Sequence, residues 1–155
     1  MPRTDAASLV VAGPIQTVFA AFVDRDALAE WLPPEGMTAD FEHFDLRPGG
    51  SYRLVLRYDD PSAGHGKATP DSDVVEARFV EVVPDVRVVQ AVDFVSDDPA
   101  FAGTMTMTWR VSPVDGGTRV DIVAEAVPDG ISADEHAKGL ASSLAKLAGL
   151  IEREG

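Results

Sequence analysis

The sequence predicts an α+β fold, in which a curved antiparallel sheet of six or seven strands wraps around a long C-terminal helix. The order of its patterns is one reason: a strand, two short helices, several strands and a final helix. The other is a leucine stripe on that final helix, which spans about 20 residues. An antiparallel sheet that exposes one face to solvent needs an apolar element packed against its other face. The final helix is the only predicted element large enough to cover that face.

The N-terminal part predicts a short strand and two short helices. Residues 8–12 are rich in apolar and β-branched side chains, and the Gly-Pro pair after them ends the strand. The proline suits the first turn of a helix, and apolar residues then recur at helical spacing through Val23. Asp24 can cap a second helix, which carries Trp31 and ends at two consecutive prolines.

Alternation of apolar and polar residues predicts the remaining strands. The alternation is only partial in the strand predicted over 37–46, where Phe41 and His43 are expected on one face and Phe44 on the other. Residues 59–73 are rich in Gly, Pro, Asp and Ser, and predict a long mobile loop near one end of the space inside the sheet. The predicted strands are 37–46, 51–58, 74–83, 86–95, 104–111 and 118–127.

The final helix is expected to begin after Ser132. Ser132 and Glu135 have the spacing of a capping box, and Asp134 and Glu135 suit the positive end of the helix dipole. The apolar stripe consists of Ala137, Leu140, Leu144, Leu147 and Ile151.

Composition narrows the function classes. The chain has 13 Lys and Arg against 26 Asp and Glu, a net charge of −13 that disfavours nucleic acid and anionic membrane surfaces as partners. It has no Cys, which excludes thiolate nucleophiles and Cys-based metal sites and fits a reducing cytoplasm. No apolar run approaches the roughly 20 residues that span a bilayer, and no signal peptide is recognised. Residues 1–155 are expected to form a single domain.

An ordered set of short motifs along nearly the whole chain resembles one superfamily. The motifs are Pro14-Ile15-Gln16-Thr17-Val18-Phe19 followed by Leu28 and Trp31, Leu46-Arg47-Pro48-Gly49-Gly50 with Tyr52-Arg53, Phe79 to Pro84 with Val86 to Val89, Thr104 to Trp109, Gly116 to Val120, and Gly139-Leu140 with Leu144 and Leu147. The set is similar to the START-like, helix-grip superfamily, also called SRPBCC or polyketide-cyclase/Bet v-like. Within it, the chain resembles the bacterial homologues of the activator of the heat-shock-protein-ninety ATPase.

The resemblance implies a cavity between the sheet and the last helix. Two departures concern its lining: the family often has Trp where this chain has Leu140, and often has Trp late in the fifth strand, where this chain has Val92 and Phe94. Smaller groups there predict a wider cavity or another ligand. Eukaryotic activators carry an extra domain that docks the chaperone; none is expected in this chain, so the resemblance does not imply chaperone activation.

The residues expected to line the cavity are mostly apolar, and Tyr52, Tyr58 and Gln90 are the polar ones that would orient a ligand. Two methionines suit an adaptable lining, although a methionine stripe is also an ordinary core feature. The candidate ligand-binding residues are Tyr52, Leu54, Leu56, Tyr58, Phe79, Gln90, Val92, Phe94, Met105, Met107, Trp109, Leu140 and Leu144.

Catalytic and metal chemistry has little support in the sequence. His43 lies on a predicted strand near carboxylates, where it is either a general base or a structural histidine. His65 lies in a Gly-His-Gly loop segment and His136 in the first turn of the last helix, without the converging ligands that a metal needs. No nucleophile or phosphate-binding motif is present, and no metal or cofactor is expected.

Three hypotheses follow. The first is a cytoplasmic protein that binds a small, mostly hydrophobic molecule. The second is an enzyme of the polyketide-cyclase or aromatase kind, with His43, Tyr52 or Tyr58 as acid or base. The third is an interaction module with a closed cavity, whose acidic surface meets a basic partner. A homodimer is left open, and Trp31 and Trp109 are expected to be buried.

Overall fold

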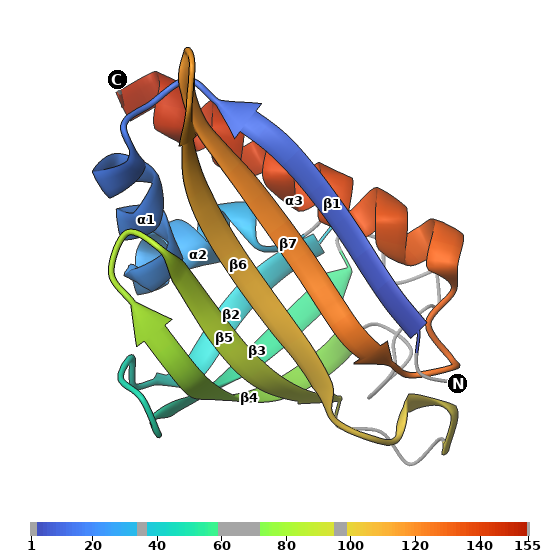
Figure 1. Ribbon diagram of the computed structural model, residues 1–155. Coiled ribbons are helices and arrows are strands. Elements are labelled where there is room, and N and C mark those ends of the chain that lie inside the picture. Colours follow the sequence, from blue (N-terminus) through green and yellow to red (C-terminus); the bar gives the residue numbers. More distant parts are fainter. Residues whose placement is uncertain (1–2, 34–36, 59–71, 95–98, 155) are drawn as a thin grey trace.

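The computed structural model describes residues 3–33, 37–58, 72–94 and 99–154 (Figure 1). Within them the strands form one seven-stranded antiparallel sheet in the order β1-β7-β6-β5-β4-β3-β2. The elements are β1 (Arg3–Val11), α1 (Ile15–Val23), α2 (Arg25–Trp31), β2 (Met37–Phe44), β3 (Ser51–Tyr58), β4 (Ser72–Val83), β5 (Arg87–Phe94), η2 (Pro99–Phe101), β6 (Met105–Val114), β7 (Gly117–Val127) and α3 (Ala133–Glu154).

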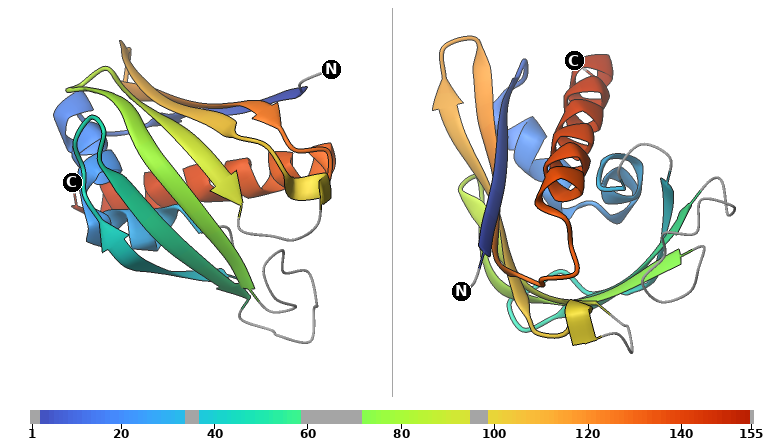
Figure 2. Two further views of the ribbon diagram at one scale, coloured as in Figure 1. Left: turned by 90° about the horizontal axis from the view of Figure 1, so that it is seen from below. Right: turned by 90° about the vertical axis from the view of Figure 1, so that its right-hand side faces the viewer.

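The chain begins at one edge of the sheet and is carried to the opposite edge by α1 and α2. From β2 it returns strand by strand to β7, which pairs with β1. The sheet curls, and α3 lies inside its curve, along β1 and running in the same direction (Figures 1 and 2). The predicted α+β architecture, a curved sheet that holds a long C-terminal helix, is therefore confirmed.

The predicted caps of two helices are also confirmed. Asp24 is extended and its carboxylate accepts the backbone N–H of Asp26 at 2.9 Å, which starts α2. Ser132 Oγ accepts the N–H of Glu135 at 3.3 Å, which starts α3. The apolar stripe of α3 begins later than predicted, because Ala137 is exposed. Its buried residues are Leu140, Ser143, Leu144, Leu147, Leu150 and Ile151.

Side chains of α3 fix the end of α2. Ser143 Oγ donates to the carbonyl of Leu32, and Lys146 Nζ donates to the carbonyl of Pro33, both at 2.7 Å. Leu32 is the C-cap of α2 and Pro33 follows it, so their carbonyls have no partner within the helix, and the two bonds satisfy them. They hold the short helices against α3.

Some strands are longer than predicted. β1 starts at Arg3 rather than at residue 8, because its polar and small residues pair with β7 as readily as the apolar ones. β4 starts at Ser72 and β6 continues to Val114. Most of the loop predicted over 59–73 lies outside the described residues, which resume at 72.

A β-bulge changes the predicted faces of β2. The pairing of β2 with β3 shifts between Phe41 and His43, so one extra residue is accommodated there. As a result Phe44 packs on the same side as Phe41, with ring centroids 5.2 Å apart, and His43 is exposed. The prediction that Phe41 and His43 share a face was wrong, because strict alternation assumes an unbroken strand.

The turn between β2 and β3 requires its glycines. The Gly50 N–H donates to the carbonyl of Arg47 at 2.8 Å, and Gly49 adopts a φ of 85°, which favours glycine. A Cβ on Gly50 would lie 2.2 Å from the carbonyl oxygen of Asp45. The turn also exchanges backbone bonds of 2.8 and 2.9 Å with Phe79, so it anchors β4 as well as β3.

No helix in the described part of the chain combines the length and the apolar character needed to cross a bilayer.

Candidate functional site

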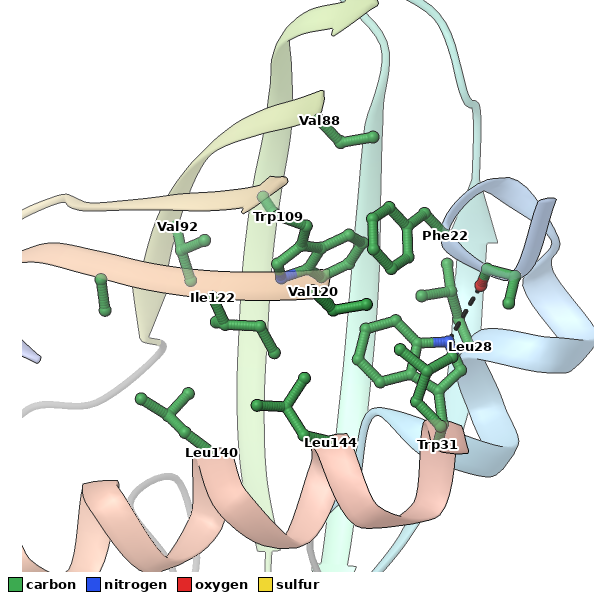
Figure 3. Close-up of a cluster of buried hydrophobic side chains, with 14 of the residues drawn as sticks. Phe22, Leu28, Trp31, Val88, Val92, Trp109, Val120, Ile122, Leu140 and Leu144 are labelled. Carbon is green, nitrogen blue, oxygen red and sulfur yellow. Dashed lines mark hydrogen bonds between the residues drawn. The ribbon is translucent and has the colours of Figure 1, made fainter. Parts of the chain in front are cut away.

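The two tryptophans pack against each other where α1 and α2 meet the sheet (Figure 3). Trp31 is 0% exposed and Trp109 is 1% exposed, as predicted. Their ring centroids lie 5.3 Å apart, and Phe22 packs on both at 5.7 to 5.8 Å. The indole N–H of Trp31 donates to the carbonyl of Ala21 at 2.9 Å. These contacts pack the end of the inner face that lies next to α1 and α2.

A second aromatic group covers the inner face of β2, β3 and β4. It consists of Phe41, Phe44, Tyr52 and Phe79, whose neighbouring ring centroids lie between 5.2 and 6.1 Å apart. The ring of Tyr52 contacts the other three, and this residue is only 3% exposed. Because its surroundings are apolar, the Tyr52 hydroxyl makes its hydrogen bond to a single polar side chain.

That partner is Gln90 on β5. The Tyr52 hydroxyl donates to Gln90 Oε1 at 2.5 Å, although the two residues are 38 positions apart in the sequence. Burial raises the pKa of Tyr52 well above its ordinary value, because a phenolate would be poorly solvated there. The phenol therefore stays protonated at neutral pH and acts as a hydrogen-bond donor rather than as a base.

Two buried donors lack a partner among the described residues: Gln90 Nε2 and Trp109 Nε1. Gln90 is 0% exposed, so its amide N–H groups are withdrawn from water as well. A buried donor without an acceptor costs about 1–3 kcal/mol. These two groups are the least satisfied polar atoms of the inner face, and they lie on adjacent strands, β5 and β6.

Most of the residues predicted to line the cavity lie on the inner face or on the facing side of α3. The backbone of Tyr58 belongs to β3, but its side chain is not among those that the structure describes. The buried ones are Tyr52, Leu54, Phe79, Gln90, Val92, Met105, Trp109, Leu140 and Leu144. Leu56, Phe94 and Met107 are partly exposed.

Comparison with known proteins identifies the family of the chain. The family described as "Activator of Hsp90 ATPase homolog 1-like protein" matches residues 12–152. The chain belongs to this family. A solved structure from Chromobacterium violaceum is 32% identical, with a TM-score of 0.84 and 96% of each chain covered. A search of the curated proteins found no match.

More distant structures share the fold. A protein of Mesorhizobium loti is 21% identical, with a TM-score of 0.74 and 99% of each chain covered. DynU16, a protein in the dynemicin biosynthetic locus, is 16% identical with a TM-score of 0.68, and the match covers 96% of this chain and 47% of DynU16. At these identities the likeness shows that the fold is shared, in agreement with the family assignment.

Val92 and Leu140, two of the residues at which the resemblance implied a departure from the family, lie on opposite sides of the site. Val92 is on β5 and Leu140 is on α3, and both are buried. Figure 3 shows their side chains extending from the sheet and from the helix toward the region around Ile122. The two aliphatic groups thus approach the same region from the sheet and from the helix.

The histidines with described side chains lie away from this inner face. His43 is exposed and its Nε2 lies 3.1 Å from Ser51 Oγ, so its candidacy as an inner-face acid or base was wrong. His65 lies outside the described residues. In the described part of the chain, no three His, Asp or Glu residues are grouped so that they could hold a metal ion.

His136 joins a polar cluster that sequence reasoning missed. Its Nδ1 lies 2.7 Å from a carboxylate oxygen of Asp5, which also accepts from Arg3 at 3.0 Å. Arg3 further donates to the carbonyl of Ile131 at 2.6 Å. Burial raises the pKa of Asp5, but hydrogen bonds from His136 and Arg3 lower it more, so the net pKa lies below its ordinary value. The cluster ties the start of β1 to the start of α3.

Proposed function

We propose that the protein binds a small, mostly apolar molecule between the inner face of the sheet and α3. Its cysteine-free composition and the bacterial sources of similar structures support a role in the bacterial cytoplasm. Its net charge of −13 makes a nucleic acid an unsuitable partner. DynU16, which shares the fold, is a protein in a biosynthetic locus, and this lends support to a small-molecule role.

The observation that carries this proposal is the partial exposure of apolar side chains on the inner face. Leu56, Phe94 and Met107 lie on β3, β5 and β6, and each is only partly buried. Phe94 and Met107 face inward because they pair directly with buried Val75 and Gln90, and Leu56 does so because it lies two residues from buried Leu54. Apolar surface that the protein's own helix leaves incompletely covered is suited to an apolar ligand.

Binding is favoured over catalysis by the state of the candidate acid and base groups. His43 is exposed, and Tyr52 is held protonated by burial, so neither is placed to remove a proton from a molecule on the inner face at neutral pH. The cyclase-like hypothesis would then rest on Tyr58, whose side chain is not described, or on another base. No such group lies among the buried residues that are described, whose polar members are Gln90, Thr118 and Ser143.

Uptake of the apolar fluorophore N-phenyl-1-naphthylamine tests the proposal. We expect its emission to rise and shift to shorter wavelength with the parent protein, and to stay near the buffer value with Met107→Trp and with Leu140→Trp. Both substitutions add volume to the space in which the ligand is proposed to lie. Ala141→Trp is the matched control, because Ala141 neighbours Leu140 in sequence but is exposed.

The melting temperature separates binding from folding in this experiment. Met107 is partly exposed, so its replacement by Trp should be tolerated more readily than a replacement in a tightly packed core, where overpacking costs about 1–3 kcal/mol. If the folded parent does not take up the fluorophore, the ligand-binding proposal fails. It also fails if both folded variants take up the fluorophore as well as the parent does.

A further inference from the structure

The two unpartnered donors belong to residues that are neighbours on the inner face of the sheet. Trp109 pairs with Val88, and Gln90 pairs with Met107, so Gln90 and Trp109 are diagonal neighbours on β5 and β6. Side chains of this length can meet across such a diagonal. Figure 3 shows the indole nitrogen of Trp109 on the side of the ring that faces away from Phe22. The Trp109 donor is thus directed away from the closed aromatic end.

The orientation of the Gln90 amide follows from its contact with Tyr52. Gln90 Oε1 accepts the phenol proton, so Nε2 points elsewhere with both of its N–H groups free. A reversed amide would leave the phenol proton without an acceptor, again in a buried place. The Tyr52 hydroxyl therefore fixes the Gln90 amide with Nε2 as its free donor.

The charge of the surroundings limits which acceptor these donors can bind. The buried polar residues in the described part of the chain are Gln90, Thr118 and Ser143, none of them charged. A carboxylate brought into such a place without a counter-charge would bear a large desolvation penalty. A neutral carbonyl oxygen accepts two hydrogen bonds without that penalty.

On the basis of the proposed function, we propose that the ligand carries a neutral carbonyl group, as in a ketone, ester or amide, whose oxygen accepts from Gln90 Nε2 and Trp109 Nε1. The apolar remainder of the ligand lies along Met107, which is the direct cross-strand neighbour of Gln90. The site thus selects its ligand by one polar atom on an otherwise apolar body. Tyr52 acts in it as a positioning residue, because it contacts Gln90 rather than the ligand.

A pair of probes that differ only at the proposed acceptor tests this inference. 2-Acetylnaphthalene has a carbonyl oxygen where 2-isopropenylnaphthalene, of nearly the same shape, has a methylene group. Their affinities are measured by displacement of N-phenyl-1-naphthylamine. For the parent we expect the ketone to bind about tenfold more tightly than the hydrocarbon, the effect of about one well-made hydrogen bond to a buried donor.

Variants locate the source of that preference. Trp109→Phe removes the indole N–H but keeps an aromatic ring, and Gln90→Met removes the amide at similar length. Each should reduce the preference for the ketone, and the double variant should abolish it. Tyr52→Phe removes the group that orients the amide and should reduce the preference less than Gln90→Met. Met107→Leu is the control: it should change both affinities equally and preserve the preference.

The outcomes separate this inference from the proposed function. Equal affinities of the parent for the two probes overturn the carbonyl site and leave apolar binding in place. A preference that persists in the folded double variant also overturns it, because the acceptor is then bound elsewhere. Failure of the parent to take up the fluorophore overturns the proposed function, and the carbonyl site with it. The comparison of probes on the parent needs no variant to fold.

Discussion

The two tryptophans allow a direct test of how a hydrogen bond to a buried indole N–H group affects stability. Both are buried and their rings are in contact, yet Trp31 Nε1 donates to Ala21 while Trp109 Nε1 lacks a partner among the described residues. Ala21 lies in the last turn of α1, where carbonyls have no partner within the helix. Trp31→Phe would therefore remove a cap of α1, whereas Trp109→Phe would remove an unsatisfied donor.

The expected difference in stability follows from these contacts. Each substitution exchanges the same ring for a smaller one in a fully buried place, so the loss of packing is similar for both. Trp31→Phe additionally leaves the Ala21 carbonyl without its partner, which costs about 1–3 kcal/mol. Trp109→Phe instead removes a desolvated N–H group. We expect Trp31→Phe to be less stable than Trp109→Phe by about 2 kcal/mol, or about 4–8 °C in Tm for a chain of this size.

Urea unfolding followed by far-ultraviolet circular dichroism measures this difference. The slopes of the two transitions should agree, so that the midpoints report stability alone. The fluorescence of the remaining tryptophan in each folded variant should be at short wavelength, which checks that the packing persists. If Trp109→Phe is as destabilising as Trp31→Phe or more so, the assignment of a satisfied and an unsatisfied indole is wrong.

The remaining predictions concern the cluster at the N-terminus and the glycines. Asp5 has a pKa below its ordinary value of 3.8, so its interaction with His136 stabilises the fold at neutral pH and is lost as the pH falls through that lowered pKa. Asp5→Asn should therefore lower Tm at neutral pH and have little effect in strong acid. Gly149→Ala should raise stability by about 1 kcal/mol, because a Cβ there meets nothing within 4 Å and Ala is the better helix former. Gly50→Ala should lower it, because its Cβ would lie 2.2 Å from the Asp45 carbonyl oxygen; thermal melts of both variants check the two signs.

Large apolar side chains made much of the sheet predictable. In β6 the alternation of Met105, Met107 and Trp109 with threonines placed the correct residues on the inner face. The same holds in β3, where Tyr52 and Leu54 are buried. Such patterns are local, and burial of an aromatic or long aliphatic group dominates the choice of face.

Features that depend on distant contacts were not predictable in the same way. Asp5 and His136 are 131 positions apart, and no local pattern indicates that the starts of β1 and α3 meet. Apolar and polar residues alternate only partly in β2, so the sequence gives no signal for the bulge after Phe41. Because of the bulge, Phe44 and His43 each lie on the face opposite to the one expected. Gln90 was recognised as polar on an inner face, but its pairing with Tyr52 requires the register of two strand pairs, β3 with β4 and β4 with β5.

The two ends of the inner face differ in what closes them, and this difference suggests a direction of entry. At one end the tryptophans are packed together and α2 is bonded to Ser143 and Lys146 of α3, so opening it would break buried contacts and hydrogen bonds. Farther along the sheet the side chains of Leu56 and Phe94 are partly exposed, as is Met107, which lies between Met105 and Trp109 on β6. Because Met107 is the cross-strand neighbour of Gln90, a ligand entering past it would meet the unpartnered amide once its apolar body is covered. Entry by this route places the carbonyl group foremost, which is the orientation that the proposed site requires.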